Sequence, residues 1–370
     1  MGDLEERYGR LPTSDRFIWE RLMLALRPCR ILRWLLAGCL ALAVSALHAP
    51  AAKAADVLTQ RYNTARTGST TQPGLNPQTV QSPRWGELGR LPVNGIVYAQ
   101  PLYVENMQAE GQQGRGLVFV ATGSNQIYAF DARTLGQAWH VDAGPNDKTA
   151  IGKPGCDGIS LPGGIGIEAT PVIDRANGVM YVSYRVNASG KAEAAQQHLR
   201  AIDIRDGHEI ADIQILPPQA PADWTKWHRS RAGLLLLNGT VYVGFASRCE
   251  DPGTPGFHGW ILGYDAKTLK RLAAFSPTLN MPGGQPVDGG GIWQGASGLS
   301  ADEQGNIYTA VGNRRPNVDG LPPETPSLAD SFIKLAPAVA RGPSGGAAGI
   351  ELRLMDWFTP YRRIWLDDQD

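Results

Sequence analysis

Seven residues of this sequence have side chains that could bind a small molecule or take part in acid–base chemistry. They supply a carboxylate, a guanidinium, an imidazole, an indole and three amides: Gln100, Glu168, Arg231, His258, Trp293, Gln294 and Asn313. Arginine and carboxylate groups can orient a polar ligand, and an indole can act as a stacking platform. These residues are far apart in the chain, so they form a site only if the fold brings them together.

A repeat in the sequence predicts the elements that would position them. The phrase "AFDARTL" at 129–135 has a near-copy, "GYDAKTL", at 263–269. Four strand-like runs also share a pattern of turn, apolar, aromatic and apolar residues. Their aromatic residues are spaced by 62, 61 and 66 positions, and they are Phe119, Tyr181, Tyr242 and Tyr308. Self-similarity at such a period is typical of a repeat architecture.

Each of these runs has three strand-like companions in a constant order. The first strands are 100–104, 169–174, 232–238 and 295–301, and the second strands are 116–124, 177–185, 238–247 and 304–313. The third strands are 126–131, 198–204, 259–265 and 330–335, and the fourth are 137–143, 209–215, 271–276 and 352–358. The sequence therefore predicts an all-β protein, a β-propeller with about four blades of four antiparallel strands each. Residues 336–349 are expected to form a loose loop inside the fourth blade.

The repeated phrase falls at the turn between the third and fourth strands of a blade. Asp131, Asp203 and Asp265 occupy the same place in that turn. An aspartate there can accept hydrogen bonds from the backbone amides that follow it. We therefore expect these carboxylates to be structural rather than catalytic.

The long loops of such a propeller gather on one face, and the seven residues fall on or beside them. These loops are 144–168, 186–197, 224–231, 247–258, 284–294 and 312–329. Glu168 and Arg231 begin inner strands and should point toward the axis, and the glycines before Trp293 allow close approach of the backbone. The alternative is structural: Trp293 plugs the channel, His258 caps a loop, and an Arg–Glu pair holds blades together.

The N-terminal part has the pattern of an export signal. A basic stretch at 27–33 precedes an apolar run at 34–47, and Ala52-Lys53-Ala54 offers a cleavage site, so cleavage is predicted near Ala54. Residues 1–54 would then be an N-terminal extension with a secretion signal, and 55–370 the propeller. Acidic residues before Met23 leave both Met1 and Met23 as possible starts. Because the apolar run is shorter than the ~20 residues that span a bilayer, we expect a periplasmic or extracellular protein without a stable membrane span; an uncleaved anchor is the alternative.

Cleavage would leave two cysteines, Cys156 and Cys249, both in loops of the same face. In an oxidising compartment a disulfide between them is expected, with two unpaired thiols as the alternative. No metal site is predicted, because the sequence contains no C-x-x-C or H-E-x-x-H pattern. The formal net charge is zero, which argues against a nucleic-acid partner.

Several stretches resemble secreted bacterial proteins with quinoprotein-like propeller repeats. They include "QPLYV", "YAFDART", "ATPVID", "LLLLNGTVYVGFAS", "HGWILGYDAKTL" and "GGGIWQGASGLSADEQGNIYTAVGN". The resemblance runs from about Gln60 to the end of the chain. It implies a parent propeller of about seven or eight blades, of which this chain would be an incomplete, C-terminally truncated copy.

The resemblance also implies a possible activity. Such enzymes hold pyrroloquinoline quinone between a tryptophan and an adjacent Cys–Cys disulfide, with calcium bound by Glu and Asn and an Asp base. Trp293, Glu168 and Asn313 are of the right types, but the sequence has no adjacent cysteine pair. We therefore expect an exported binding or scaffold module with no assigned cofactor, whose partner is a protein, a glycan or a small molecule on the loop-rich face. The alternatives are a dehydrogenase-like protein that oxidises an alcohol or sugar with pyrroloquinoline quinone and calcium, and a non-functional fragment.

Overall fold

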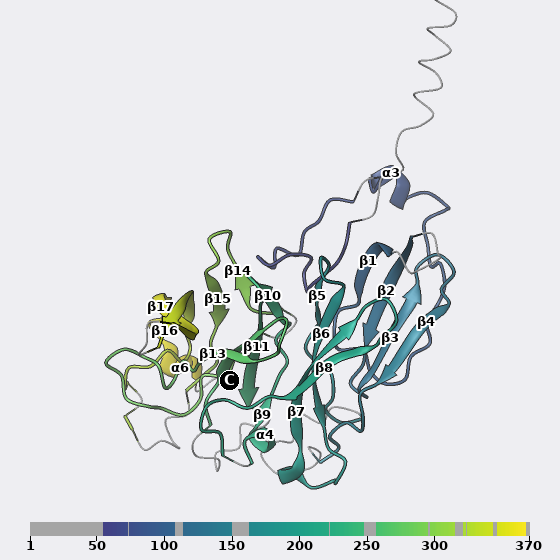
Figure 1. Ribbon diagram of the computed structural model, residues 1–370. Helices are drawn as coiled ribbons and strands as arrows, with labels where there is room; N and C mark the ends of the chain where they lie inside the picture. Colours follow the sequence, from purple (N-terminus) through teal and green to yellow (C-terminus); the bar gives the residue numbers. More distant parts are fainter. Residues whose placement is uncertain are drawn as a thin grey trace, which may run out of the picture. The chain divides into compact units, whose positions relative to one another are not determined.

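The computed structural model describes residues 55–72, 74–107, 114–149, 163–221, 223–247, 257–294, 297–314, 321–322, 324–342 and 346–367. These residues form four antiparallel β-sheets that follow one another along the chain (Figure 1). Helical segments among them are short: α3 (Pro77–Val80), η1 (Ala192–Ala194), α4 (Trp224–Trp227) and α6 (Arg363–Asp367). No helix in the described ranges is long and apolar enough to cross a bilayer.

Each sheet is built from four consecutive strands in the order of the chain. The first contains β1 (Leu102–Met107), β2 (Arg115–Ala121), β3 (Gln126–Asp131) and β4 (Gln137–Asp142), and the second β5 (Val172–Asp174), β6 (Val179–Val186), β7 (Gln196–Asp203) and β8 (Glu209–Gln214). The third contains β10 (Leu235–Leu237), β11 (Thr240–Ser247), β12 (Trp260–Asp265) and β13 (Arg271–Phe275), and the fourth β14 (Ser300–Ala301), β15 (Ile307–Ala310), β16 (Phe332–Arg341) and β17 (Ala347–Phe358). The predicted fold class, with four blades, is confirmed.

Two details differ from the expectation. A two-residue strand, β9 (His228–Arg229), pairs with the end of β11 and adds a fifth strand to the third sheet. Residues 336–349 are not a loose loop: β16 and β17 extend through both ends of this range and pair over it, from Ala336 opposite Arg353 to Arg341 opposite Ala347. The alternation of small and apolar residues in "APAVA" suits an extended hairpin, which the glycine-rich tip had obscured.

Apolar side chains between successive sheets form the core. One cluster, with Leu102, Phe119 and Met180, joins the first two sheets. Tyr181 and Phe245 belong to the cluster between the second and third sheets, and a further cluster joins the third to the fourth. Face-to-face packing of this kind is what makes the sheets blades of a propeller.

The expected turn aspartates behave as predicted. The Asp131 carboxylate accepts hydrogen bonds from the backbone amides of Arg133 (3.0 Å) and Thr134 (2.8 Å). Asp265 accepts the same pair of bonds from the amides of the two equivalent residues. Hydrogen bonds from the Thr134 backbone amide lower the pKa of Asp131, so the carboxylate is ionised and committed to the turn.

The first strands are linked to one another in sequence order. The backbone amide of Gln100 donates to Thr170 Oγ1 (2.9 Å), and the backbone amide of Leu234 donates to the carbonyl of the same threonine (3.0 Å). Gly233 in turn donates to the Ser297 carbonyl (2.9 Å). The beginnings of the four inner strands are therefore joined across all four blades.

An N-terminal segment, residues 57–66, crosses these inner strands. Val57 forms a β-bridge with Tyr103 of the first blade, and the Leu58 carbonyl accepts from the Ile173 backbone amide of the second (2.9 Å). In the third blade, Arg66 Nη2 donates to the Leu234 carbonyl (2.8 Å). In the fourth blade, the Ala301 backbone amide donates to the Thr64 carbonyl (2.8 Å). Sequence patterns gave no sign of this, because the contacts use backbone groups that every residue carries. The segment ties the blades together at their inner edge.

Candidate functional site

The strongest charged contact near the inner strands is the ion pair between Glu168 and Arg229. Arg229 Nε donates to Glu168 Oε2 over 2.6 Å, and Nη2 donates to Oε1. The two side chains are only 4% and 2% exposed. Such a bidentate pair fixes the orientation of both groups.

The local sequence explains how Arg229 reaches this position. Strand β9 places His228 opposite Ser247 and Arg229 opposite Ala246, at the end of β11. The chain then continues into β10, the inner strand of the third blade. Arg229 is thus held by a strand pairing before the blade begins, and it faces Glu168 at the start of the second blade's inner strand.

Two buried polar atoms beside this pair have no partner among the described residues. They are Nη1 of Arg229 and the hydroxyl of Tyr98. Burial, together with the charge of Glu168, raises the pKa of Tyr98, although Arg229 acts in the opposite direction. Buried polar atoms without partners carry a free-energy cost, and they often mark a place where a ligand or a water molecule completes the network.

Arg231 and Trp293 lie together at the same place. The Arg231 guanidinium lies over the Trp293 ring, 5.6 Å from its centroid. Arg231 is exposed, yet its pKa is lowered by partial burial and by the charge of Arg229, while Glu168 acts against this. The site therefore contains two guanidiniums and one carboxylate.

Backbone glycines make room for the Trp293 indole. A Cβ on Gly291 would lie 3.0 Å from Trp293 Nε1, and a Cβ on Gly312 would lie 3.0 Å from Cδ1. Gly312 also donates to the Gly291 carbonyl (2.8 Å). The indole therefore lies close to the backbone at Gly291 and Gly312, and the Arg231 guanidinium lies over its ring.

The other four predicted residues make structural contacts. Gln100 accepts from the Arg61 amide (3.0 Å), and Gln294 donates to the Ala310 carbonyl (2.9 Å). The Asn313 carbonyl accepts from Gly290 (2.9 Å). His258 lines a separate cavity, and its Nδ1 contacts Thr278 Oγ1 (3.0 Å). Of the seven residues, the structure brings Glu168, Arg231 and Trp293 into one cluster.

Cys156 and Cys249 lie outside the described residues, as do residues 1–54. The disulfide and the export signal therefore stay predictions. The charged cluster consists of Tyr98, Glu168, Arg229, Arg231 and Trp293, and we call it the axial cluster.

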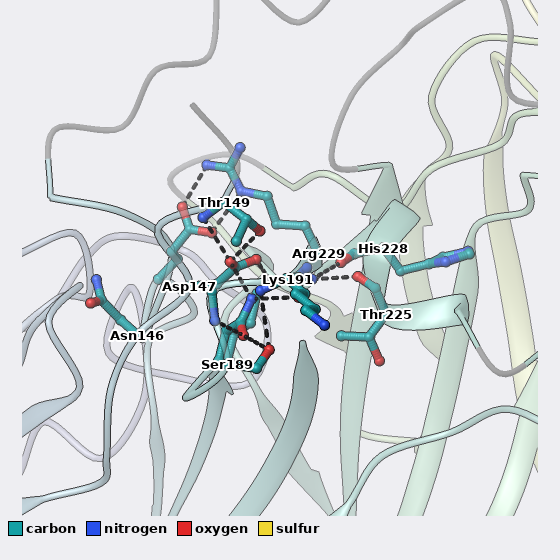
Figure 2. A network of polar contacts seen from close by, with 12 residues as sticks. Asn146, Asp147, Thr149, Ser189, Lys191, Thr225, His228 and Arg229 are labelled. Carbon is teal, nitrogen blue, oxygen red and sulfur yellow. Dashed lines mark hydrogen bonds and ion pairs between the residues drawn. The ribbon is translucent and has the colours of Figure 1, made fainter. Parts of the chain in front are cut away.

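Sequence reasoning missed two of its members and a second polar network. Arg229 was passed over in favour of Arg231, because the two-residue strand β9 leaves no periodic signal. The second network surrounds Asp147, whose Oδ2 accepts from Arg185 Nε over 2.7 Å, with both side chains fully buried. Figure 2 shows Asp147 between Thr149 and Ser189, with Thr225 and His228 on the other side. Arg185 also donates to the carbonyls of those last two residues.

The contacts of Asp147 are those of a structural network. Its carboxylate also accepts from the Thr149 amide (2.9 Å) and from Asn187 Nδ2 (3.0 Å). Burial would raise the pKa of Asp147, but the charge of Arg185 and these hydrogen bonds outweigh it and lower the pKa to about 2. We regard it as a structural latch between loops of the first and second blades and α4.

The axial cluster does not fit a calcium ion. Both oxygens of the Glu168 carboxylate are engaged by Arg229. Within the part of the chain that the structure describes, no three His, Cys, Asp or Glu side chains are grouped so as to hold a metal. Calcium prefers several oxygen ligands, whereas this carboxylate already neutralises a guanidinium.

Comparisons with known proteins show the fold. No protein-family model matches the chain, and no curated protein matches it. Among solved structures, it is similar to the quinohemoprotein alcohol dehydrogenase from Comamonas testosteroni, with a TM-score of 0.55, 16% identity, and coverage of 85% of this chain and 42% of that one. It is also similar to a quinohemoprotein alcohol dehydrogenase from Pseudomonas putida HK5, with a TM-score of 0.53, 16% identity, and coverage of 82% and 40%.

A europium-containing methanol dehydrogenase gives a TM-score of 0.51 at 16% identity, with coverage of 82% of this chain and 48% of that one. The chain thus has a quinoprotein-like propeller fold, as the sequence resemblance implied. It spans less than half the length of these three proteins.

Proposed function

We propose that the axial cluster binds a small, flat, anionic molecule, and that the chain acts as a binding module. The observation that carries this is Arg231 stacked over Trp293 beside the Glu168–Arg229 pair. Two arginines against one carboxylate leave one positive charge, which suits a carboxylate on the ligand. The Arg231 guanidinium that covers the Trp293 ring is itself planar, and a flat group can stack on it.

The unpartnered donors support the same ligand class. Nη1 of Arg229 and the Tyr98 hydroxyl are both hydrogen-bond donors, and neither has an acceptor among the described residues. An oxygen-rich anion would satisfy both. A cation at this position would be repelled by the guanidiniums of Arg229 and Arg231.

Titration of the full-length chain with pyrroloquinoline quinone, a planar tricarboxylate, tests this proposal through quenching of tryptophan fluorescence. We expect saturable binding that EDTA does not change, because the Glu168 carboxylate is held by Arg229. Replacement of Arg231 by Gln or of Trp293 by Leu should weaken binding by about tenfold, equivalent to roughly 1.4 kcal/mol. Arg205→Gln, an exposed arginine on another turn, is the matched control. Equal binding by all variants would place the ligand elsewhere.

A second candidate function is a quinone-dependent dehydrogenase. The observation that favours it is the likeness in fold to the alcohol dehydrogenases above. The calcium of such an enzyme does not fit the described residues of the axial cluster, so these residues support no catalytic step that runs through the metal. If an alcohol or glucose reduces a dye in the presence of the chain, the quinone and calcium, and EDTA abolishes this, the dehydrogenase replaces the binding module.

We also infer export from the basic and apolar stretches at 27–47 and the cleavage site near Ala54. Sequencing the N-terminus of the chain recovered from a bacterial periplasm checks this inference. A chain that retains residues 27–54 in the cytoplasm would contradict it.

A further inference from the structure

A cavity lies beside α4 and the third blade, and its lining includes none of the residues of the axial cluster. Its volume is about 630 Å³. Aromatic and proline side chains dominate its walls, and the described residues that line it include Trp224, Trp227, Phe257, Trp260, Pro217, Pro218 and Pro221. Residues 217–221, Asp223 and residues 279–280, together with α4 and the start of β12, build these walls.

The charge of the lining favours a cation. Asp223 is a carboxylate on this wall, and the described lining contains no lysine or arginine. The lining also contains two imidazoles, His228 and His258. Burial lowers the pKa of His228 to about 4, and burial also lowers the pKa of His258.

The prolines and aromatic rings of the lining also favour a cation. Proline carries no backbone N–H, so Pro217, Pro218 and Pro221 add no backbone donors to the lining, and the carbonyl of Pro221 accepts from the Trp224 backbone amide (3.0 Å). The faces of the aromatic rings are regions of negative potential. A ligand that carries a positive charge without strong hydration satisfies such walls better than a neutral polyol, which needs donors as well.

The chain already uses one of these rings in this way. Lys226 Nζ lies 4.5 Å from the centroid of the Trp227 ring and is paired with Glu193 at 3.5 Å. The Trp227 Nε1 donates to Asp223 Oδ2 over 3.2 Å, which couples ring and carboxylate. With Asp223 and Glu193 against Lys226, the formal charge around this ring is negative.

We propose that this cavity binds a small organic cation, an alkylated ammonium group enclosed by Trp227, Trp260 and Phe257 with Asp223 as its counter-charge. The negative faces of aromatic rings attract a cation, and this attraction is stronger when the cation is desolvated. This inference is independent of the anion proposed for the axial cluster, since the two sites carry opposite charge.

The test compares choline with its neutral carbon isostere, 3,3-dimethylbutan-1-ol, by calorimetric titration of the full-length chain. The two molecules have nearly the same shape, so a difference in affinity reports the charge. We expect choline to bind at least tenfold more tightly than the isostere. Equal affinity for the two molecules would show that the cavity recognises apolar shape but not charge, and it would overturn the proposal. Binding of methyl glucoside in preference to choline would also overturn it.

Variants locate the binding. Asp223→Asn keeps an acceptor for Trp227 but removes the charge, and we expect at least fivefold weaker binding of choline. Asp206→Asn, on an exposed turn, is the matched control and should bind choline normally. Leu279 lies at the edge of the cavity and is 37% exposed, so folding should tolerate a lysine there. Leu279→Lys places a positive charge beside the bound cation, and we expect choline binding to be lost. Unchanged choline binding in both Asp223→Asn and Leu279→Lys would show that choline binds elsewhere. Trp293→Leu, in the axial cluster, should leave the choline affinity unchanged.

Discussion

Three arginines on the loop-rich face are almost completely buried, and each is paired. Arg185 binds Asp147, Arg229 binds Glu168, and Arg314 donates to backbone carbonyls, among them that of Pro322 at 2.6 Å. Burying a guanidinium costs several kcal/mol unless its partners are well placed. These residues therefore hold the loops of the face in one arrangement, and removing one partner should cost more than an ordinary surface pair.

The buried pair between Arg185 and Asp147 should stabilise the fold. We test this with Arg185. Its replacement by Met keeps the aliphatic stem but leaves Asp147 as an unpaired buried charge, so the free energy of unfolding should fall by about 3–5 kcal/mol. Arg205→Met removes an exposed pair with Asp203, where the arginine is 57% exposed, and should cost less than about 1 kcal/mol. Urea denaturation followed by circular dichroism measures both. Similar losses in the two variants would contradict the role of Arg185 as a latch.

The same pair predicts a pH dependence. Asp147 has a folded pKa of about 2, below the unfolded value of about 3.9. A lowered carboxyl pKa stabilises the fold above the unfolded value, and this contribution is lost as pH falls through the folded pKa. Asp147→Asn should therefore be less stable than the parent chain at pH 6, and the difference should shrink between about pH 4 and pH 2. A difference that stays constant over this window would contradict the prediction.

At the scale of single residues, the contacts that the sequence predicted join residues close together in the chain. The turn aspartates were predictable because their partners lie two or three residues away. Glu168 and Trp293 were recognised by type and by neighbouring glycines. Arg229, Tyr98 and Asp147 were missed because their partners come from distant loops, and the identity of a partner across space leaves no mark in local sequence.

At the scale of elements, the N-terminal segment 57–66 acts as a strap across the four inner strands. Arg66 is central to it, since its guanidinium donates to the carbonyls of Gln60 (2.8 Å), Leu234 (2.8 Å) and Leu299 (3.0 Å). It is 7% exposed, and burial lowers its pKa to about 10, which still leaves it charged at neutral pH.

We predict that Arg66→Gln loosens this strap. Charge-assisted hydrogen bonds contribute about 1.5–3 kcal/mol each, and a glutamine can replace only part of the set, so a loss of roughly 3 kcal/mol is expected. Limited proteolysis should cut near residues 57–66 faster than in the parent chain. Arg84→Gln, at an exposed position of the same N-terminal region, should leave the cleavage rate unchanged. Equal protection of Arg66→Gln and the parent would show that the strap does not depend on Arg66.

The sequence predicted strands better than it predicted this strap. Three of the four third strands were predicted within two residues of their observed bounds, such as β3 at Gln126–Asp131, because apolar residues and turn signals delimit them, whereas β16 continues to Arg341. Three of the four inner strands are shorter than expected, as in β14 (Ser300–Ala301), since the chain beside them bonds to neighbouring blades and to the strap instead of continuing the sheet; β1 is not shortened.

At the scale of the molecule, the two outermost sheets differ in how their outer faces are covered. Leu91 and Val93 pack on Val120, Tyr128 and Phe130 of the first sheet. The fourth sheet buries Ile333, Leu335 and Leu352 against the third, while large apolar residues on or after its outer strands are exposed. They include Phe332 (62%), Met355 (58%), Phe358 (64%), Tyr361 (100%) and Trp365 (56%).

An exposed apolar surface of this kind, next to an edge strand, favours association. Among the described residues β17 pairs only with β16, and Phe332 lies opposite Phe358 across that pair. We therefore predict that the chain self-associates as its concentration rises, and that Phe332→Ser with Phe358→Ser reduces this. Leu88→Ser, at a position 86% exposed in the N-terminal region, is the control and should not. Sedimentation velocity from micromolar concentrations upward measures it. A parent chain that stays monomeric throughout, or a double variant that associates as strongly as the parent, would show that this face is stable in water without a partner.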